Sequence, residues 1–135
     1  MGTGPTTVEQ KTGRCLCGRI GFTFEPNAIR WSGHCYCESC RRATASAVTT
    51  FVGLSESGFR WTKGKVRTYE SSPHVVRSFC PDCGTQLAFQ SEKWPGEVHV
   101  YAATLCDSTW LQPEAIYHAD ERLPWIDVKG DFPKR

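Results

Sequence analysis

Seven of the eight cysteines in this sequence of 135 residues fall into three clusters whose spacing could bind metal ions. The clusters are Cys15-Leu16-Cys17, Cys35-Tyr36-Cys37-Glu38-Ser39-Cys40 and Cys80-Pro81-Asp82-Cys83. Cysteines one or two residues apart can direct their thiolates at one ion from a tight turn, and zinc suits tetrahedral sulfur sites. Three such clusters predict zinc binding in preference to a role as buried apolar thiols.

The expected redox state of the cysteines follows from their frequency and from the start of the chain. Eight cysteines in 135 residues fall short of the roughly 8–10% that marks a disulfide scaffold. Residues 1–13 are polar and lack the basic end and apolar stretch of a secretory leader. We therefore expect reduced thiols and a cytoplasmic protein. No apolar run approaches the ~18 residues of a membrane span.

Seven clustered ligands divide most naturally into four and three. Structural zinc is closed by four ligands, whereas catalytic zinc keeps three protein ligands and one open position. Gly18 follows Cys17 and Gly84 follows Cys83, and glycine permits the positive-φ turn in which backbone N–H groups point at sulfur. The expected structural set, called the cysteine quartet below, is Cys15, Cys17, Cys80 and Cys83. An ion shared by such distant turns would stabilise the whole domain.

The remaining cysteine trio consists of Cys35, Cys37 and Cys40, and it would form the site with an open position. Arg41 and Arg42 follow it, and their charges would favour thiolates and hold the carboxylates of an anionic substrate. An alternative is that His34 or Cys106 completes a second closed site.

The cysteine and histidines outside the clusters are expected to have ordinary roles. Cys106 is predicted to be a buried or half-buried free thiol. His74, His99 and His118 lack ligand spacing, so we expect them at the surface or in the core.

The remaining residues must build the elements that position these sulfur atoms. One domain fits this length, and 39% hydrophobic residues can supply a core, which excludes general disorder. We assign residues 13–135 to one zinc domain and residues 1–12 to a flexible N-terminus. The net charge of +2 does not indicate a nucleic acid or an anionic membrane as partner.

Most of the chain has the pattern of short strands, which are β-branched or aromatic and bounded by turn residues. The predicted strands are 20–24, 66–69, 75–79, 87–89 and 98–101, with edge strands at 114–118 and 125–128. Residues 38–48 lack Gly and Pro and allow a helical turn or two. The tryptophans expected in the core or at its rim are Trp31, Trp61, Trp94, Trp110 and Trp125. The fold class is therefore mainly β, with short antiparallel sheets.

Three segments together resemble the glutathione-dependent formaldehyde-activating enzyme (GFA) family, which includes centromere protein V. They are residues 13–18 (GRCLCG), 34–42 (HCYCESCRR) and 79–84 (FCPDCG). The resemblance extends from Gly13 to about Val128 and is that of a short member. Members often carry an acidic residue where this chain has Cys106.

The resemblance implies a small Mss4-like fold held by zinc, with two zinc ions per chain. One would be a structural zinc on the cysteine quartet, and the other a catalytic zinc on the cysteine trio. The implied activity is that of a zinc-dependent carbon–sulfur lyase, similar to S-hydroxymethylglutathione synthase, with glutathione and an aldehyde as small-molecule partners. The thiol would enter as the fourth ligand of the trio's zinc. No residue is assigned as general acid, and the oligomeric state is left open.

Two other functions compete with this one. Methionine sulfoxide reductases can share this type of fold and zinc, and Cys106 would then be the nucleophile. A non-enzymatic adaptor, chaperone or glutathione-binding module would need the zinc for stability alone. An open trio favours chemistry or thiol binding, whereas an eighth ligand would favour the adaptor.

Overall fold

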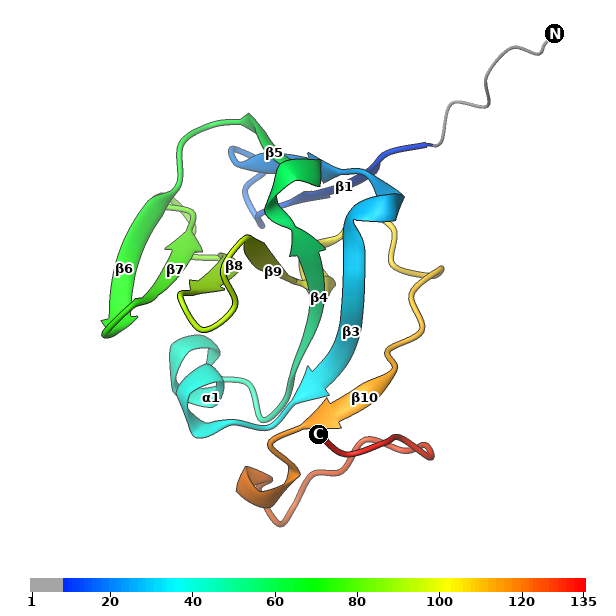
Figure 1. Ribbon diagram of the computed structural model, residues 1–135. Coiled ribbons are helices and arrows are strands. Elements are labelled where there is room, and N and C mark those ends of the chain that lie inside the picture. The colour runs from blue at the N-terminus through cyan, green and yellow to red at the C-terminus, as the bar shows by residue number, and fades with distance from the viewer. Residues whose placement is uncertain (1–8) are drawn as a thin grey trace, which may run out of the picture.

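The computed structural model describes residues 9–135, which form two β-sheets and one short α-helix (Figure 1). The strands are β1 (Lys11–Arg14), β2 (Gly21–Phe24), β3 (Ile29–Cys35), β4 (Thr49–Ser55), β5 (Phe59–Lys63), β6 (Arg67–Ser72), β7 (Val75–Phe79), β8 (Gln86–Ser91), β9 (Glu97–Tyr101) and β10 (Ala115–Tyr117). The helices are α1 (Glu38–Thr44) and the 3₁₀ turns η1 (Pro26–Ala28), η2 (Glu56–Gly58), η3 (Ala102–Thr104) and η4 (Ala119–Glu121).

The smaller sheet has the strand order β1-β2-β5, and the larger has the order β10-β3-β4-β9-β8-β7-β6. Neighbouring strands are antiparallel, as expected, except that β10 pairs parallel with β3. The fold class is therefore mainly β, with sheets rich in antiparallel pairs. Cysteine clusters that could bind zinc lie in turns between strands and at the junction of β3 and α1, and the architecture is consistent with an Mss4-like fold.

Strand alternation places two different side-chain clusters on opposite faces of the larger sheet. Val52 in β4 and Val100 in β9 belong to the main apolar core, which also takes in Phe22 and Phe24 of the smaller sheet. The next residue along each strand points the other way because the side-chain period of a strand is two. Phe51 and its neighbours therefore form a second cluster, together with two cysteines of the trio. The larger sheet thus separates the core from the site.

The predicted strands at 20–24, 66–69, 75–79, 87–89 and 98–101 are confirmed to within a few residues. The edge strand at 114–118 is confirmed as β10, and the helical turns expected in 38–48 are α1. The sequence reading missed β1, β3, β4 and β5. β4 pairs with β9 and β5 pairs with β2, which lie far away in sequence, and local patterns do not show such partners.

The edge strand predicted at 125–128 is wrong, because this segment is a turn and irregular chain. The Arg122 guanidinium donates to the carbonyl oxygen of Ile126 at 2.6 Å, and the N–H of Val128 donates to the Tyr36 hydroxyl at 2.8 Å. Side chains, rather than a strand, therefore satisfy this backbone.

The tryptophan prediction is confirmed in part. Trp31 and Trp110 pack against the two apolar clusters. Trp61 and Trp94 are partly exposed, and each packs against neighbouring aromatic rings at the rim. The prediction is wrong for Trp125, which is 71% exposed. Pro124 and the turn that it begins hold this residue away from the sheets.

The folded unit begins earlier than residue 13. Lys11 pairs with Phe24, and the Thr23 hydroxyl donates to the Lys11 carbonyl oxygen at 2.8 Å. These contacts place residues 11 and 12 in the smaller sheet. Residues 1–8 of the predicted flexible N-terminus lie outside the described residues, and the single-domain assignment of 13–135 stays a prediction.

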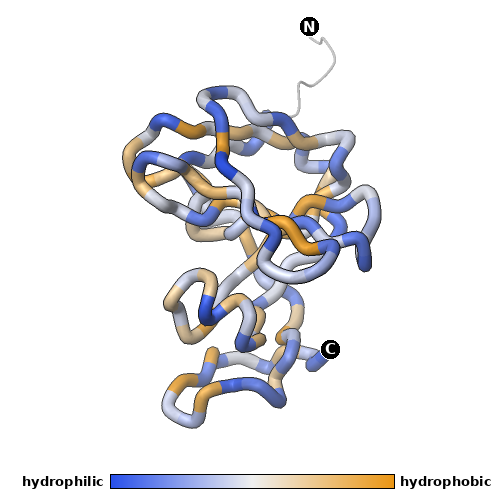
Figure 2. The backbone as a smooth tube through the Cα atoms, turned by 90° about the vertical axis from the view of Figure 1, so that its left-hand side faces the viewer, coloured by the Kyte–Doolittle hydropathy of each residue, from blue (hydrophilic) through white to orange (hydrophobic). Residues whose placement is uncertain are grey.

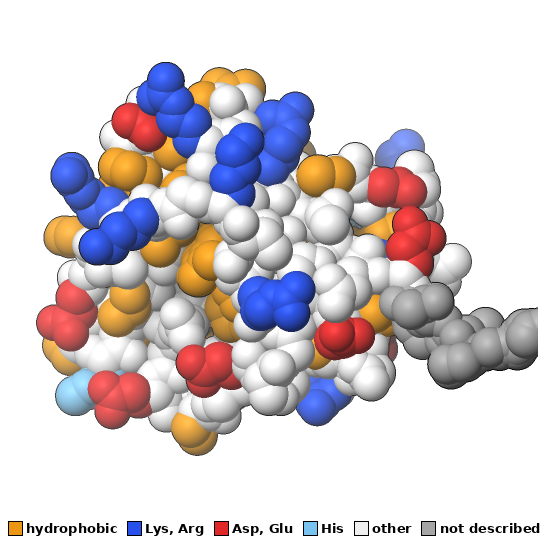
Figure 3. Space-filling model, turned by 90° about the horizontal axis from the view of Figure 1, so that it is seen from above, with side chains coloured by type: hydrophobic (Ala, Val, Ile, Leu, Met, Phe, Trp, Pro, Cys, Tyr) orange, Lys and Arg blue, Asp and Glu red, His pale blue; other side chains and the backbone are white. Residues whose placement is uncertain are grey.

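Hydrophobic and hydrophilic residues are mixed along every segment of the backbone in Figure 2. Within residues 9–135, no helix has the length and apolar character needed to cross a membrane. Figure 3 shows charged side chains of both signs spread over the face that it presents.

Two glycines make room for aromatic rings on neighbouring strands of the larger sheet. A Cβ atom on Gly53 of β4 would overlap the Trp31 indole, and one on Gly33 of β3 would overlap the Tyr117 ring. The indole lies over the glycine, and its Nε1 donates to the Glu97 carboxylate at 3.2 Å. Glycine at position 53 thus fixes where Trp31 lies.

We expect Gly53→Ala to lower the free energy of unfolding by about 1–3 kcal/mol, because the added methyl group must displace the indole. Urea denaturation followed by circular dichroism measures this change. Gly21→Ala is the matched control, since its Cβ would lie 3.3 Å from the nearest atom, at the flexible end of Thr62. Equal losses from both variants would contradict the packing role of Gly53.

Candidate metal centres and the adjoining cavity

The four thiols of the cysteine quartet come together although more than 60 residues separate its two turns. Their sulfur atoms all lie within 4.8 Å of one another. The Sγ atoms of Cys15 and Cys17 are 3.6 Å apart, and those of Cys17 and Cys80 are 3.8 Å apart. Four sulfurs at ~2.3 Å from one ion in a tetrahedron are about 3.8 Å apart. The donor set therefore fits zinc.

Both turns of the quartet have the same backbone design. Gly18 and Gly84 each have a φ of 80°, as their positions after the second cysteine predict. Each glycine N–H donates to the carbonyl oxygen of the first cysteine in its turn, at 3.2 Å for Cys15 and 2.9 Å for Cys80. These turns also direct N–H groups at sulfur, from Ile20 to Cys15 and from Asp82 to Cys80.

Hydrogen bonds to its sulfur favour the thiolate form of Cys83. The pKa of Cys83 is lowered to about 5, first by the Thr85 hydroxyl at 3.2 Å and then by backbone N–H groups. The Thr85 hydroxyl also accepts the N–H of Leu16 at 3.1 Å. One threonine thereby joins the two turns.

The cysteine trio is carried by the junction between β3 and α1. Cys35 ends β3, Cys37 caps the helix, and Cys40 lies in its first turn. The Cys37 sulfur accepts the N–H of Cys40 at 3.3 Å, which satisfies a donor that the helix leaves free. The three sulfur atoms lie within 4.8 Å of one another, so they could share one ion. Both predicted sets are thus brought together.

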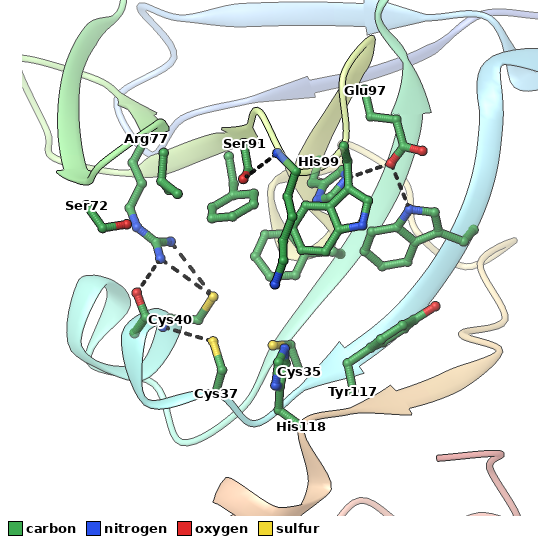
Figure 4. A pocket seen from close by; sticks show the side chains of 17 residues that line it. Cys35, Cys37, Cys40, Ser72, Arg77, Ser91, Glu97, His99, Tyr117 and His118 are labelled. Atoms are coloured by element: carbon green, nitrogen blue, oxygen red, sulfur yellow. Dashed lines mark hydrogen bonds and ion pairs between the residues drawn. The ribbon is translucent and has the colours of Figure 1, made fainter. Parts of the chain in front are cut away.

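Arg77 of β7 lies against the trio, and the sequence reading missed it. Its side chain is buried, with only 3% of the residue exposed. The guanidinium donates to the hydroxyls of Tyr101 at 2.8 Å and Ser39 at 3.0 Å, and two of its nitrogens lie 3.8 Å from the Cys40 sulfur (Figure 4). The missed signal was a charged residue at the centre of a predicted strand otherwise made of Val, Ser and Phe.

Charge is distributed unequally among the three sulfurs. The pKa of Cys40 is lowered to about 3, first by hydrogen bonds from Cys35 and Cys37 and then by the charge of Arg77. The pKa of Cys35 is raised well above its ordinary value, because its thiol interacts with the other two sulfurs and is buried. Negative charge therefore gathers on the sulfur beside the guanidinium.

Arg41 and Arg42 lie outside the cavity beside the trio. The Arg41 guanidinium donates to the carbonyl oxygen of Glu121 at 2.7 Å, which ties η4 to α1. Arg42 pairs with Glu38 at 3.0 Å on the exposed side of the helix and borders a neighbouring hollow that Ser39 also lines. Their predicted binding of substrate carboxylates stays a prediction.

Neither proposed fourth ligand joins the trio. Successive residues of β3 point to opposite faces, so His34 turns away from Cys35, and its Nδ1 lies 2.8 Å from the Thr50 hydroxyl. Cys106 lies beside the quartet, in a hollow that it shares with Cys15. The prediction that Cys106 is buried or half-buried is wrong, because it follows a one-residue bridge and its side chain is exposed.

A cavity of about 390 Å³ opens beside the trio. The three cysteines, Ser39 and Arg77 line one side of it. The rest of the lining is mainly aromatic, and the rings of this aromatic side belong to Trp31, Phe51, Phe89, Trp94, His99 and Tyr117. It meets the thiol side at Phe51, which packs with Cys35 and Cys40, and at Phe89, which lies 5.0 Å from the Arg77 guanidinium. Figure 4 shows the sulfur atoms and the Arg77 guanidinium on one side and the rings around His99 on the other.

His99 is the buried titratable group of the aromatic side, with 4% of the residue exposed. Its Nε2 lies 2.8 Å from the Glu97 carboxylate, which leaves Nδ1 as the free ring nitrogen. Burial lowers the pKa of His99 although Glu97 opposes that effect. The imidazole is therefore neutral at neutral pH. As expected for a core residue, its ring packs on Trp31 and Phe89.

A third group of metal-binding side chains, which local spacing did not predict, lies on η4. Ligand atoms of His118, Asp120 and Glu121 lie within 4.8 Å of one another. All three residues are largely exposed, and the Glu121 carboxylate accepts the N–H of Glu38 at 2.9 Å. This group therefore has a structural use at the start of α1.

Comparisons with known proteins agree with this architecture. The chain is similar to a crystal structure of a Rhodobacter sphaeroides protein, with 23% sequence identity and a TM-score of 0.62. That match covers 92% of this chain and 99% of the other, and it shows a shared fold. A search of the curated proteins found no match.

The family comparison is more specific than the fold comparison. The model of the family described as glutathione-dependent formaldehyde-activating enzyme matches residues 10–120, which include the quartet and the trio. The matched region covers most of the chain. The protein therefore belongs to the glutathione-dependent formaldehyde-activating enzyme family.

Proposed function

We propose that this protein catalyses the reversible addition of glutathione to an aldehyde, which makes it a carbon–sulfur lyase of the S-hydroxymethylglutathione synthase type. The observation that carries this proposal is that three convergent thiols, without a fourth protein ligand among residues 9–135, line a cavity large enough for substrates. Membership of the family supports glutathione and formaldehyde as partners. Eight free thiols suit a reducing compartment, and we place the reaction in the cytoplasm.

We further propose that the chain holds two zinc ions, one on the quartet and one on the trio. Zinc held by three cysteines would supply an open coordination position at which a thiol binds as the thiolate. The quartet has no free position and would act in folding alone.

Arg77 holds the trio in place from outside it. Through Ser39 and Cys40 its guanidinium fixes the first turn of α1 to β7, and through Tyr101 it fixes the same turn to β9. Its charge offsets negative charge on the thiolates, which burial would otherwise penalise. Arg77 is therefore a positioning residue.

The charged ends of glutathione need cationic partners in or beside the cavity. Lys93 lines the cavity, and its ammonium lies 5.7 Å from the centre of the Trp94 ring. Arg42 borders the neighbouring hollow, which shares Ser39 and Arg77 with the cavity. We assign the two carboxylates of glutathione to these two cations.

We assign the proton transfer of the reaction to the free Nδ1 atom of His99, which lines the same cavity as the trio. Neutral His99 takes the proton of the incoming thiol at Nδ1, and Glu97 holds the imidazolium that forms. The thiolate sulfur then forms a bond to the aldehyde carbon, and the carbon–oxygen π pair moves to oxygen. That oxygen takes the proton back from His99. The product is a hemithioacetal, and the reverse sequence cleaves the carbon–sulfur bond.

Neither competing function is supported by a specific contact. Cys106, the nucleophile that a methionine sulfoxide reductase would need, lies beside the quartet and does not line the cavity. A zinc-stabilised adaptor would have no use for a cavity that opens onto three thiols.

The two zinc sites should differ in their effect on stability. Structural zinc contributes on the order of 10 kcal/mol in small metal-folded domains, against a total stability of about 5–15 kcal/mol. Cys83→Ser should therefore unfold the protein or make it insoluble. Cys37→Ser should melt within a few degrees of the wild type, because serine can still cap α1 and the trio closes only a six-residue loop.

Thermal melts and metal analysis of both variants test this difference. The wild type should contain two zinc ions per chain, and Cys37→Ser should contain one. If Cys37→Ser melts as low as Cys83→Ser, the trio is a structural site and the proposed function is wrong.

Glutathione should change the absorption of cobalt bound in place of zinc, because an added thiolate alters the sulfur-to-metal bands. We expect Arg42→Ala to weaken glutathione binding roughly threefold to tenfold by loss of one charge contact. Arg30→Ala removes an exposed arginine that lines neither hollow and is the matched control. The absence of any spectral change with glutathione would favour the adaptor.

Activity should depend on pH through His99. Burial lowers the pKa of His99 below the ordinary 6.5, so the neutral base is present at neutral pH. The rate should fall as the pH drops through this lowered pKa, because His99 is then protonated. His99→Gln should lower kcat by roughly 100-fold and remove this dependence. The same burial means that protonation opposes folding, so stability should also fall as the pH drops from 6.5 through the lowered pKa. An unchanged pH profile in His99→Gln would exclude His99 as the proton carrier.

A further inference from the structure

The cavity is larger and more apolar than formaldehyde requires. Formaldehyde has two non-hydrogen atoms, whereas a volume of 390 Å³ is in the range of pockets that hold ligands of drug size. A water molecule occupies about 30 Å³, so a bound formaldehyde would leave several waters against aromatic walls. Release of such waters to bulk solvent is favourable in free energy, because the rings offer them few hydrogen-bond partners.

The rings form a continuous wall rather than scattered contacts. Phe89 stacks on His99 at 5.5 Å between ring centres, and Trp94 lies 5.4 Å from the same imidazole. The Trp31 ring meets the His99 ring edge-on, with 4.7 Å between ring centres. It also lies tilted against the Tyr117 ring, with 5.0 Å between ring centres. A flat apolar group can make offset or edge contacts with such a wall.

The charged ends of glutathione fit the cations of the site better than its rings. Its two carboxylates and its ammonium group would lose hydration against an apolar ring face. Arg77 and Lys93 line the cavity, and Arg42 borders the neighbouring hollow. With glutathione held by these cations, the ring faces are left to the other reactant.

We propose that the physiological aldehyde carries a bulky apolar group, preferably an aromatic ring, which packs in the cavity against the wall that Trp94, Phe89 and Trp31 form with His99. This inference rests on the proposed function and names its substrate class. The reaction is unchanged: the thiolate sulfur bonds to the carbonyl carbon, the π pair moves to oxygen, and oxygen takes the proton that the thiol gave up. The ring of the aldehyde replaces water in the cavity.

Binding of two stable thioethers tests this inference without turnover. S-benzylglutathione places a phenyl ring on the carbon that an aromatic aldehyde would supply, and S-methylglutathione places only a methyl group there. We expect calorimetric titration of the zinc-loaded protein to show tenfold or greater tighter binding of the benzyl compound. Trp94→Ala should remove most of this preference, because Trp94 is 42% exposed and forms the outer part of the wall.

Trp125→Ala is the control variant, since Trp125 is exposed and does not line the cavity. It should keep the full preference. In an activity assay, glutathione with benzaldehyde should give a higher kcat/KM than glutathione with formaldehyde in the wild type.

The other outcomes separate an error in the substrate class from an error in the proposed function. If glutathione perturbs bound cobalt but the two thioethers bind equally, the aromatic substrate class is wrong and the proposed function stands. If the preference survives in Trp94→Ala, the ring does not pack on this wall and the inference is wrong. If neither glutathione nor either thioether binds, the proposed function fails and the substrate class fails with it.

Discussion

A buried guanidinium beside three thiols is the constraint on which the site depends. Arg77 stays charged at any physiological pH, and a buried charge is costly unless negative charge and hydrogen-bond acceptors surround it. The fold supplies both, with the Cys40 sulfur opposite the guanidinium and hydroxyls of Ser39, Ser71 and Tyr101 around it. These groups come from α1, β6 and β9 as well as β7, so satisfying one cation fixes four elements around the cavity.

We assign different roles to the quartet and the trio because their cysteines are spaced differently along the chain. The quartet draws on turns far apart in sequence, so an ion there would restrain the unfolded chain strongly. The trio draws on one junction between strand and helix, and an ion there would restrain little. The quartet can thus stabilise the fold while the thiols of the trio stay open to substrates. The larger sheet separates the two centres, with the core on one face and the cavity on the other.

The metal-ligand sets could be predicted from the sequence because they are local: cysteine spacing and a following glycine determine the turns that bear them. Short strands with clear alternation could be predicted for the same reason. The aromatic wall could not, because it depends on register between strands far apart, such as Gly53 opposite His99. A charged residue at the centre of β7 was a signal for Arg77, but nothing in that strand shows that α1 lies against it. Family resemblance supplied the metal sets and the chemistry, but no information about the wall.

The sulfur ligands and the aromatic wall reside on separate parts of the chain. The trio occupies six residues at the junction of β3 and α1, whereas the wall is spread over β3, β4, β8, β9, β10 and the loop that carries Trp94. Phe51 packs with Cys35 and Cys40, whereas Trp94 lies outside that cluster, so substitutions at the outer part of the wall disturb the thiols least. A scaffold divided in this way can diversify: duplicated copies keep one reaction and acquire different aldehydes, each through a few changes of aromatic side chain.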